Sequence, residues 1–191
     1  MTDLPKIGKP ATQALKQIGI FTLEDLRKID LASLKKLHGV GPKAIGLLEE
    51  AMQKNKQHFA DPIDLPVNVP FALLGDLSCD NAPKRRQVRD FIIGRTMQHR
   101  ELMVKDLHEA VEFITLGEGS QTVDQLLARN TYADKKIASL TIQSVLSHGK
   151  EAAALSIITF MEGEQWFQSD FIEFSNQSKK GLIKKVISIN K

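Results

Sequence analysis

The chain has 191 residues, of which 42% are hydrophobic and 26% charged, and its formal net charge at neutral pH is +3. These values are typical of a globular protein with one large or two small domains. There is no run of about eighteen apolar residues, and the opening MTDLPKIGKP lacks the order of a secretory signal. We therefore expect a cytoplasmic protein with no membrane partner.

Metal and cofactor sites are not indicated. Cys79 is the only cysteine, so it cannot form an internal disulfide, and the five histidines show no metal-ligand spacing. We expect no metal, no cofactor and an ordinary thiol at Cys79.

A stretch with three prolines and little charge, residues 59–76, divides the chain. It lacks helical periodicity, which predicts a semi-extended linker. Residues 1–58 hold ten Lys or Arg against six Asp or Glu, whereas the rest of the chain holds sixteen against seventeen. We predict a first domain over 1–58, a linker over 59–76 and a second domain over 77–191.

The first domain repeats itself at an offset of 33 residues. The repeat pairs Leu4 with Leu37, Ile7 with Val40, Gly8 with Gly41, Ala11 with Ala44 and Leu15 with Leu48. Between the copies, Thr22 with Asp25 predicts one capped helix, and Asp30 predicts the cap of the next. Four or five short helices, arranged as a pseudo-symmetric pair of hairpins, are expected.

The second copy contains LHGVGPKAIGLLEEAM, residues 37–52. Glycine accepts backbone angles that other residues resist, so HGVG can turn tightly between two helices. The helix beginning near Pro42 then presents free N–H groups and the positive end of its dipole. Such a helix start suits a phosphate, and Lys43 adds a cation beside it.

This segment resembles the helix-hairpin-helix family, and residues 4–56 are similar to the paired domains of recombinases and repair proteins. The resemblance implies sequence-independent binding of double-stranded DNA through minor-groove phosphates. The implied contacts are Gly39, Val40, Gly41 and Lys43, and more weakly Gly8 and Lys9. Lys6 stands where the first copy should have its first glycine. Packing or protein docking remains the alternative role for such hairpins.

The second domain begins with helices and continues as strands. Residues 81–101 follow a helical stripe that includes Phe91 and Arg95, and a short helix over 101–107 follows. We expect a strand over 109–117, a helix over 120–130, and strands over 136–149, 151–161, 164–175 and 181–190. This order predicts an α+β fold with helices on one face of a curved antiparallel sheet.

Residues 77–191 resemble the nuclear transport factor 2-like superfamily, in particular its SnoaL-like branch. The resemblance rests on the helix APKRRQVRDFIIG, the strand AVEFITLG with its following helix, and the segment from HGKEAAAL to the end. It implies a cone-shaped domain, often a homodimer, whose pocket can hold a small apolar ligand. Function varies widely on this fold, so individual residues have to carry the argument.

Alternation in QWFQSDFIEF places Trp166, Gln168 and Asp170 on one face of a strand. By the same resemblance, Asp170 takes the place of the oxyanion-hole aspartate of ketosteroid isomerases. Phe113 stands where the general base belongs, and a proton donor without a base cannot run an enolisation. His148, at a strand end, is a conceivable partner of Asp170.

We therefore predict a non-enzymatic, sequence-independent DNA-binding protein with a C-terminal domain for dimerisation or for a small ligand, and we assign no catalytic residue. One alternative is an enzyme of the ketosteroid isomerase or SnoaL type acting on a small hydrophobic substrate. The other is a protein-interaction scaffold. The run KRRQVR, residues 84–89, is expected to be a solvated helix face.

Overall fold

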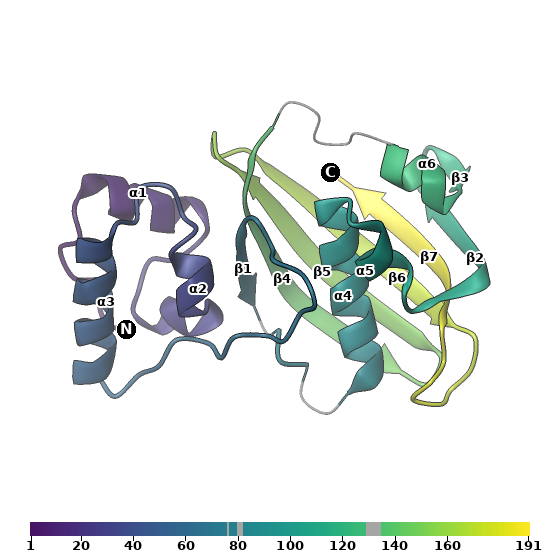
Figure 1. Cartoon of the computed structure of the whole chain (residues 1–191), viewed down its shortest axis with the longest axis horizontal. Helices are drawn as coiled ribbons and strands as arrows, with labels where there is room; N and C mark the ends of the chain where they lie inside the picture. Colours follow the sequence, from purple (N-terminus) through teal and green to yellow (C-terminus); the bar gives the residue numbers. More distant parts are fainter. Residues whose placement is uncertain (76, 80–81, 129–134) are drawn as a thin grey trace. The chain divides into compact units, whose positions relative to one another are not determined.

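The computed structural model describes residues 1–75, 77–79, 82–128 and 135–191 (Figure 1). Contacts divide the chain into two compact units. The first unit comprises residues 1–75, 135–141 and 158–165, and the second comprises 76–134, 142–157 and 166–191. The expected boundaries 1–58, 59–76 and 77–191 stay a prediction, because compactness does not measure independent folding. Among the described residues, no helix is both long and apolar enough to span a bilayer.

The first unit contains short helices. They are α1 (Lys9–Gln17), the 3₁₀ helix η1 (Glu24–Lys28), α2 (Leu31–Leu34) and α3 (Pro42–Lys54). The cap predicted at Asp30 is present, since the Ser33 N–H donates to Asp30 Oδ1 at 2.9 Å. Thr22 and Asp25 do bond reciprocally, but the helix that follows is a 3₁₀ helix whose N-cap residue is Leu23. These side chains satisfy amides that a helix start otherwise leaves without a partner.

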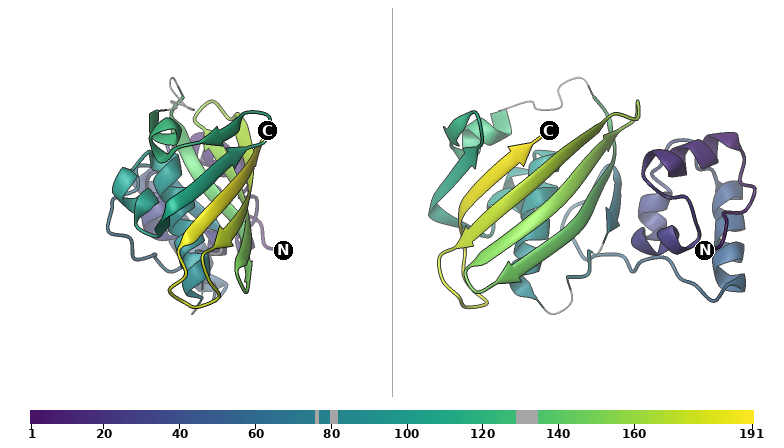
Figure 2. Two further views of the ribbon diagram at one scale, coloured as in Figure 1. Left: turned by 90° about the vertical axis from the view of Figure 1, so that its right-hand side faces the viewer. Right: turned by 180° about the vertical axis from the view of Figure 1, so that it is seen from behind.

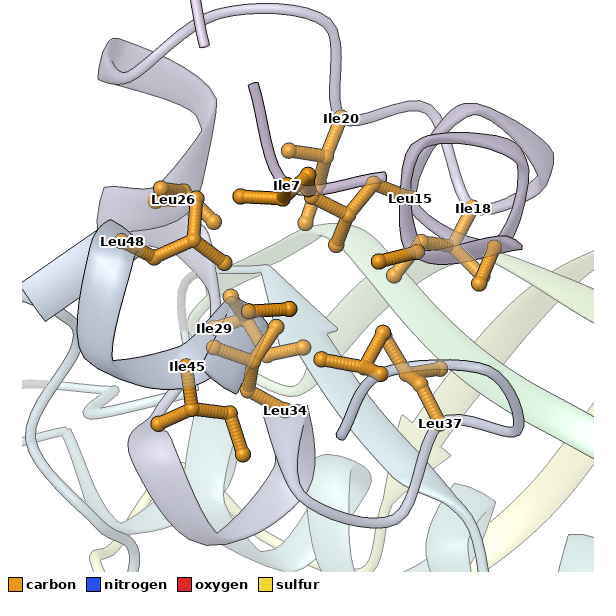
Figure 3. Close-up of a cluster of buried hydrophobic side chains, with 14 of the residues drawn as sticks. Ile7, Leu15, Ile18, Ile20, Leu26, Ile29, Leu34, Leu37, Ile45 and Leu48 are labelled. Atoms are coloured by element: carbon orange, nitrogen blue, oxygen red, sulfur yellow. The ribbon is translucent and has the colours of Figure 1, made fainter. Parts of the chain in front are cut away.

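The 33-residue repeat has a structural meaning in the first unit. Leu15 and Leu48 are both 0% exposed, and Ile7 and Val40 are both buried. Figure 3 shows apolar side chains of the helices and their connections meeting in one core. Equivalent positions of the two copies therefore face the same core.

Strand β1 (Ala72–Gly75) belongs to this unit, although the sequence predicted a linker there. The Leu73 N–H donates to Ser33 Oγ at 3.2 Å, and Leu74 forms a bridge with Ile29. Ala72 and Leu74 are buried in the helical core. Long-range partners on the helices thus order a segment whose own composition favours a linker.

The remaining elements build a helix-on-sheet layer. The helices are α4 (Pro83–Met97), α5 (Arg100–Val104) and α6 (Val123–Ala128). The strands are β2 (Leu107–Thr115), β3 (Gly119–Gln121), β4 (Ile137–His148), β5 (Glu151–Phe160), β6 (Gln165–Phe174) and β7 (Ile183–Asn190). Helices α4 and α5 cover one face of the curved sheet, which we call the inner face (Figure 2). We call the opposite face the outer face.

The sheet order is β1-β4-β5-β6-β7-β2-β3, and the sheet is mixed. Strands β6 and β7 are antiparallel, but β2 runs parallel to β7, with Phe113 opposite Val186. The expectation of an antiparallel sheet was therefore wrong at this pair. Parallel neighbours need a long crossover connection, and here the elements from β3 to β6 provide it.

Candidate functional site

Two places in the chain gather the residues that the sequence singled out. The first is formed by the two glycine turns of the first unit, at Gly8 and at Gly39 to Gly41. Gly8 is the N-cap of α1 and Gly41 is the N-cap of α3, and each helix has proline in its first turn. Both helix starts therefore carry backbone amides without helical partners.

The first copy does not take the helix-hairpin-helix form, because residues 1–8 hold no helix. Asp3 instead bridges to Thr22 in an extended segment. The turns also bend differently, since the positive φ lies at Gly39 in the second copy and at Gly8 in the first, both at 90°. Lys6, at the position equivalent to Gly39, has no positive φ.

The two turns lie against each other. A Cβ added at Gly39 would stand 3.2 Å from the carbonyl oxygen of Pro10, at the start of α1. Val40 is buried and anchors the turn, whereas Gly41, Lys43 and Lys9 are exposed. The predicted contact residues thus present two helix starts side by side.

Charge around these turns is of one sign. Residues 4–21 carry three lysines and residues 31–48 carry three more, and neither range contains an acidic residue. All six acidic residues of 1–58 lie outside these two ranges. Both glycine turns therefore lie in stretches of sequence that carry lysines and no acidic residue.

The second place is the inner face of β6 and β7, below α4. Asp170 is 1% exposed, and both its carboxylate oxygens accept from Arg95, at 2.9 and 2.7 Å. The Ser188 hydroxyl donates to the same carboxylate at 2.6 Å, and the Gln168 amide lies 3.4 Å from it. We call Arg95, Gln168, Asp170 and Ser188 the inner cluster.

Aromatic side chains border the inner cluster. Phe113 stacks on Phe91 with ring centroids 5.8 Å apart, and the Arg95 guanidinium lies 5.0 Å from the Phe91 ring centroid. Trp166 is half-buried on the same face of β6. The Asn190 Oδ1 atom, on the strand next to β6, is buried with no donor among the described residues.

His148 and Asp170 are not brought together. The buried apolar residues of β4 fall on even positions as far as Ile142, but the next buried residue is Val145, on an odd position, so Leu146 and His148 are exposed. The sequence placed His148 in one register with Ile142, and the break in alternation is the reason for the difference. His148 borders a hollow on the outer face instead.

The run KRRQVR was expected to be solvated, and that was wrong for two of its basic residues. Lys84 is 8% exposed and donates to the carbonyl oxygens of Gly149 and Asn176. Arg89 is 5% exposed and bonds Asp90 and the Leu77 carbonyl. Burial lowers the pKa of Lys84, and the nearby Lys150 adds to that effect.

Sequence reasoning missed Arg95 as the partner of Asp170. The signal was present, because Arg95 is a charged residue on the apolar stripe of its helix, and a buried charge requires a partner. In the described ranges, no three His, Cys, Asp or Glu side chains are grouped closely enough to hold a metal ion.

No protein-family model matches the sequence, and no curated protein matches it. Solved structures with a similar backbone do exist. One is a protein of Kribbella flavida provisionally named a ketosteroid isomerase, at 19% identity over 57% of this chain and 78% of that one, with a TM-score of 0.46.

A nuclear transport factor 2-like protein of Burkholderia xenovorans matches at 10% identity over 59% of this chain and 86% of that one, with a TM-score of 0.47. A protein with a ketosteroid isomerase-like fold from Catenulispora acidiphila, in complex with trimethylamine, matches at 11% identity over 53% and 82%, with a TM-score of 0.42. At such identities and TM-scores, the likeness carries no argument about what this chain binds.

Proposed function

We propose that the chain binds the phosphate backbone of double-stranded DNA, without reading sequence, through the turns at Gly8–Lys9 and Gly39–Lys43. The observation that carries the proposal is the charge pattern, in which two adjoining helix starts lie in sequence stretches, residues 4–21 and 31–48, that contain lysines and no acidic residue. Amides at a helix start and flexible lysines are the groups that hold phosphate without contacting bases.

The expected affinity is low. A few phosphate contacts give dissociation constants of roughly 10⁻⁴ to 10⁻⁶ M at physiological salt, and each contact adds about 0.9 to the slope of log K against log salt. A homodimer, which stays a prediction, would place two such surfaces on one duplex and raise the avidity without new contacts.

The test is fluorescence anisotropy of a labelled duplex titrated with the full chain at about 50 and 200 mM salt, where the salt dependence is measurable. Lys9→Gln combined with Lys43→Gln is expected to weaken binding and lower the salt slope by about 2. The control combines Lys54→Gln with Lys56→Gln, which removes equal charge at the far end of α3. An equal loss in both double variants contradicts the assignment to the turns.

A second candidate is a small-molecule site at the inner cluster. It is favoured by one observation, the buried Asn190 Oδ1 beside the inner cluster, which has no donor in the described part of the chain. A ligand hydroxyl or amine would satisfy such an acceptor. We favour binding over turnover here, since the resemblance implies that Phe113 stands where the general base is expected, and since Asp170 is held by Arg95.

The two candidates are separable by one variant. Asn190→Leu removes the unpartnered oxygen and leaves the glycine turns unchanged. It is expected to abolish the thermal shift from any hydroxylated or amine ligand of the inner cluster, while DNA binding stays at the unsubstituted level. Turnover that is lost on Asp170→Asn would move the proposal to the enzyme of the ketosteroid isomerase type.

A further inference from the structure

A hollow of about 600 Å³ lies on the outer face of the sheet, over the ends of β4, β5, β6 and β7. Its lining includes the apolar side chains of Leu146, Ala153 and Phe171, which we call the floor. It also includes the ionisable side chains of His148, Glu151, Glu173 and Lys185, which we call the rim. Ligand sites commonly measure about 300 to 1,000 Å³. The hollow is separate from the inner cluster, because side chains alternate between the two faces of a strand.

The floor is apolar and open. Leu146 is 68% exposed and Phe171 is 52% exposed, and Ala153 lies with them in the lining. Seen from behind in Figure 2, no described helix covers these strands. Large apolar side chains left in water gain free energy when a ligand covers them.

The rim has an excess of negative charge. Glu173 lies opposite Lys185 in the ladder of β6 and β7, but the Lys185 Nζ is 3.4 Å from the Glu112 carboxylate on β2. Neither Glu151 nor Glu173 has an ion-pair partner in the described ranges. Two carboxylates without a direct ion-pair partner therefore stand beside an apolar floor.

We propose that this hollow binds an organic cation with an apolar body, such as a substituted ammonium on an aliphatic or aromatic group. The carboxylates of Glu151 and Glu173 attract the cation, and the face of the Phe171 ring adds a cation–π contact. The apolar body covers Leu146 and Ala153. A neutral hydrophobe would desolvate the carboxylates without pairing them, and an anion would be repelled. The glycine turns and the inner cluster take no part, so the proposal goes beyond both candidate functions.

The test is a titration of the isotope-labelled full chain with benzyltrimethylammonium chloride, followed by amide chemical shifts. Saturable shifts are expected around Leu146 to Ala153 and Phe171 to Glu173. Affinity is expected to be about millimolar, given the ligand efficiency of small molecules. Benzoate, of similar size and opposite charge, is expected to cause no saturable shift there.

Three variants locate the site. Glu151→Gln and Glu173→Gln are each expected to weaken binding about 2- to 5-fold, and Phe171→Ala about 5- to 10-fold. Glu162→Gln, an equal charge change on an exposed turn outside the hollow, is expected to leave binding unchanged. The glutamine variants preserve the shape of the side chain, so they test binding at the hollow even if the Phe171→Ala protein does not fold.

Three results overturn the proposal. They are equal weakening by Glu162→Gln, saturable binding of benzoate at the same amides, and self-association on concentration that shifts the Phe171 amide and blocks the cation. In the last case a second copy of the chain occupies the hollow.

Discussion

In the first unit, Lys9 and Lys43 are exposed beside helix starts, whereas in the second unit Lys84 is buried and the Arg95 side chain is only 12% exposed. Neither exposed lysine has an ion-pair partner in the described ranges. The buried cations are held by carbonyl oxygens or by a carboxylate. A basic residue left in water is available to a ligand, while a buried one is committed to the fold.

The largest expected loss of stability concerns the buried ion pair of Arg95 and Asp170. Removing one member of the Arg95–Asp170 pair, by Arg95→Met or Asp170→Leu, leaves a buried charge without compensation. Each variant is expected to lose about 3–5 kcal/mol of unfolding free energy in urea. The double variant is expected to recover much of the loss, because no unpaired charge remains.

The matched control is the exposed pair Arg100–Asp124, whose side chains are 58% and 78% exposed. Arg100→Met is expected to change stability by at most about 1 kcal/mol. Similar losses of unfolding free energy at the two pairs would mean that the burial of Asp170 does not cause the large loss expected at the buried pair.

A smaller effect separates the two kinds of lysine. Lys84→Met leaves the carbonyl oxygens of Gly149 and Asn176 without their donor, at a cost of about 1–3 kcal/mol in urea unfolding. Lys43→Met, at an exposed position, is expected to stay within about 0.5 kcal/mol. Equal losses of unfolding free energy in the two variants would contradict the distinction between a buried lysine that supports the fold and an exposed lysine that can bind a ligand.

Lys84 also makes the stability of the protein depend on pH in the alkaline range. Its folded-state pKa is lowered from 10.5 by burial, so the unfolded chain binds the proton more tightly. Stability therefore rises as the pH climbs through the folded pKa towards 10.5. This rise is expected to be absent from denaturation midpoints of Lys84→Met.

Substitutions of two glycines test how the turn at Gly39 contributes to the stability of the first unit. Gly39 has φ of 90°, so Gly39→Ala is expected to cost about 1–2 kcal/mol of thermal stability. Gly46, in α3, has open space around it, and Gly46→Ala is expected to stabilise by about 0.4–1 kcal/mol. A Gly39→Ala protein with unchanged stability would show that the turn tolerates another backbone conformation.

The smallest expected effect is the dependence of the stability of the first unit on pH in the acid range. The Thr2 N–H donates to both carboxylate oxygens of Glu24, and these bonds lower its pKa from 4.5 to about 2. The stabilisation is present above pH 4.5 and is lost as the pH falls towards about 2. Denaturation midpoints of Glu24→Gln are expected to change less over that range. Equal slopes for the two proteins would remove Glu24 from the explanation.

Much of the fold could be predicted from local patterns in the sequence. The cap at Asp30, the Thr22–Asp25 bonds and the strands β4 to β7 were readable because each depends on residues close in sequence, and the 33-residue repeat is visible in the sequence itself. Strand β1 and the parallel pairing of β2 with β7 were not predicted. Both depend on partners far along the chain, which local periodicity does not encode.

The candidate sites divide in the same way. The alternation of β6 placed Gln168 and Asp170 on one face, and the glycines predicted a tight turn before α3. The sequence by itself thus determined which residues share a strand face or begin a helix, because those relations follow from backbone geometry.

Only the tertiary structure decided which residues meet. It paired Asp170 with Arg95 rather than His148, buried Lys84 and Arg89 of a run that composition placed in solvent, and set Gly39 against Pro10. The physical reason is that a side chain's partners are fixed by the packing of distant elements, and a buried charge persists only where that packing supplies its counterpart.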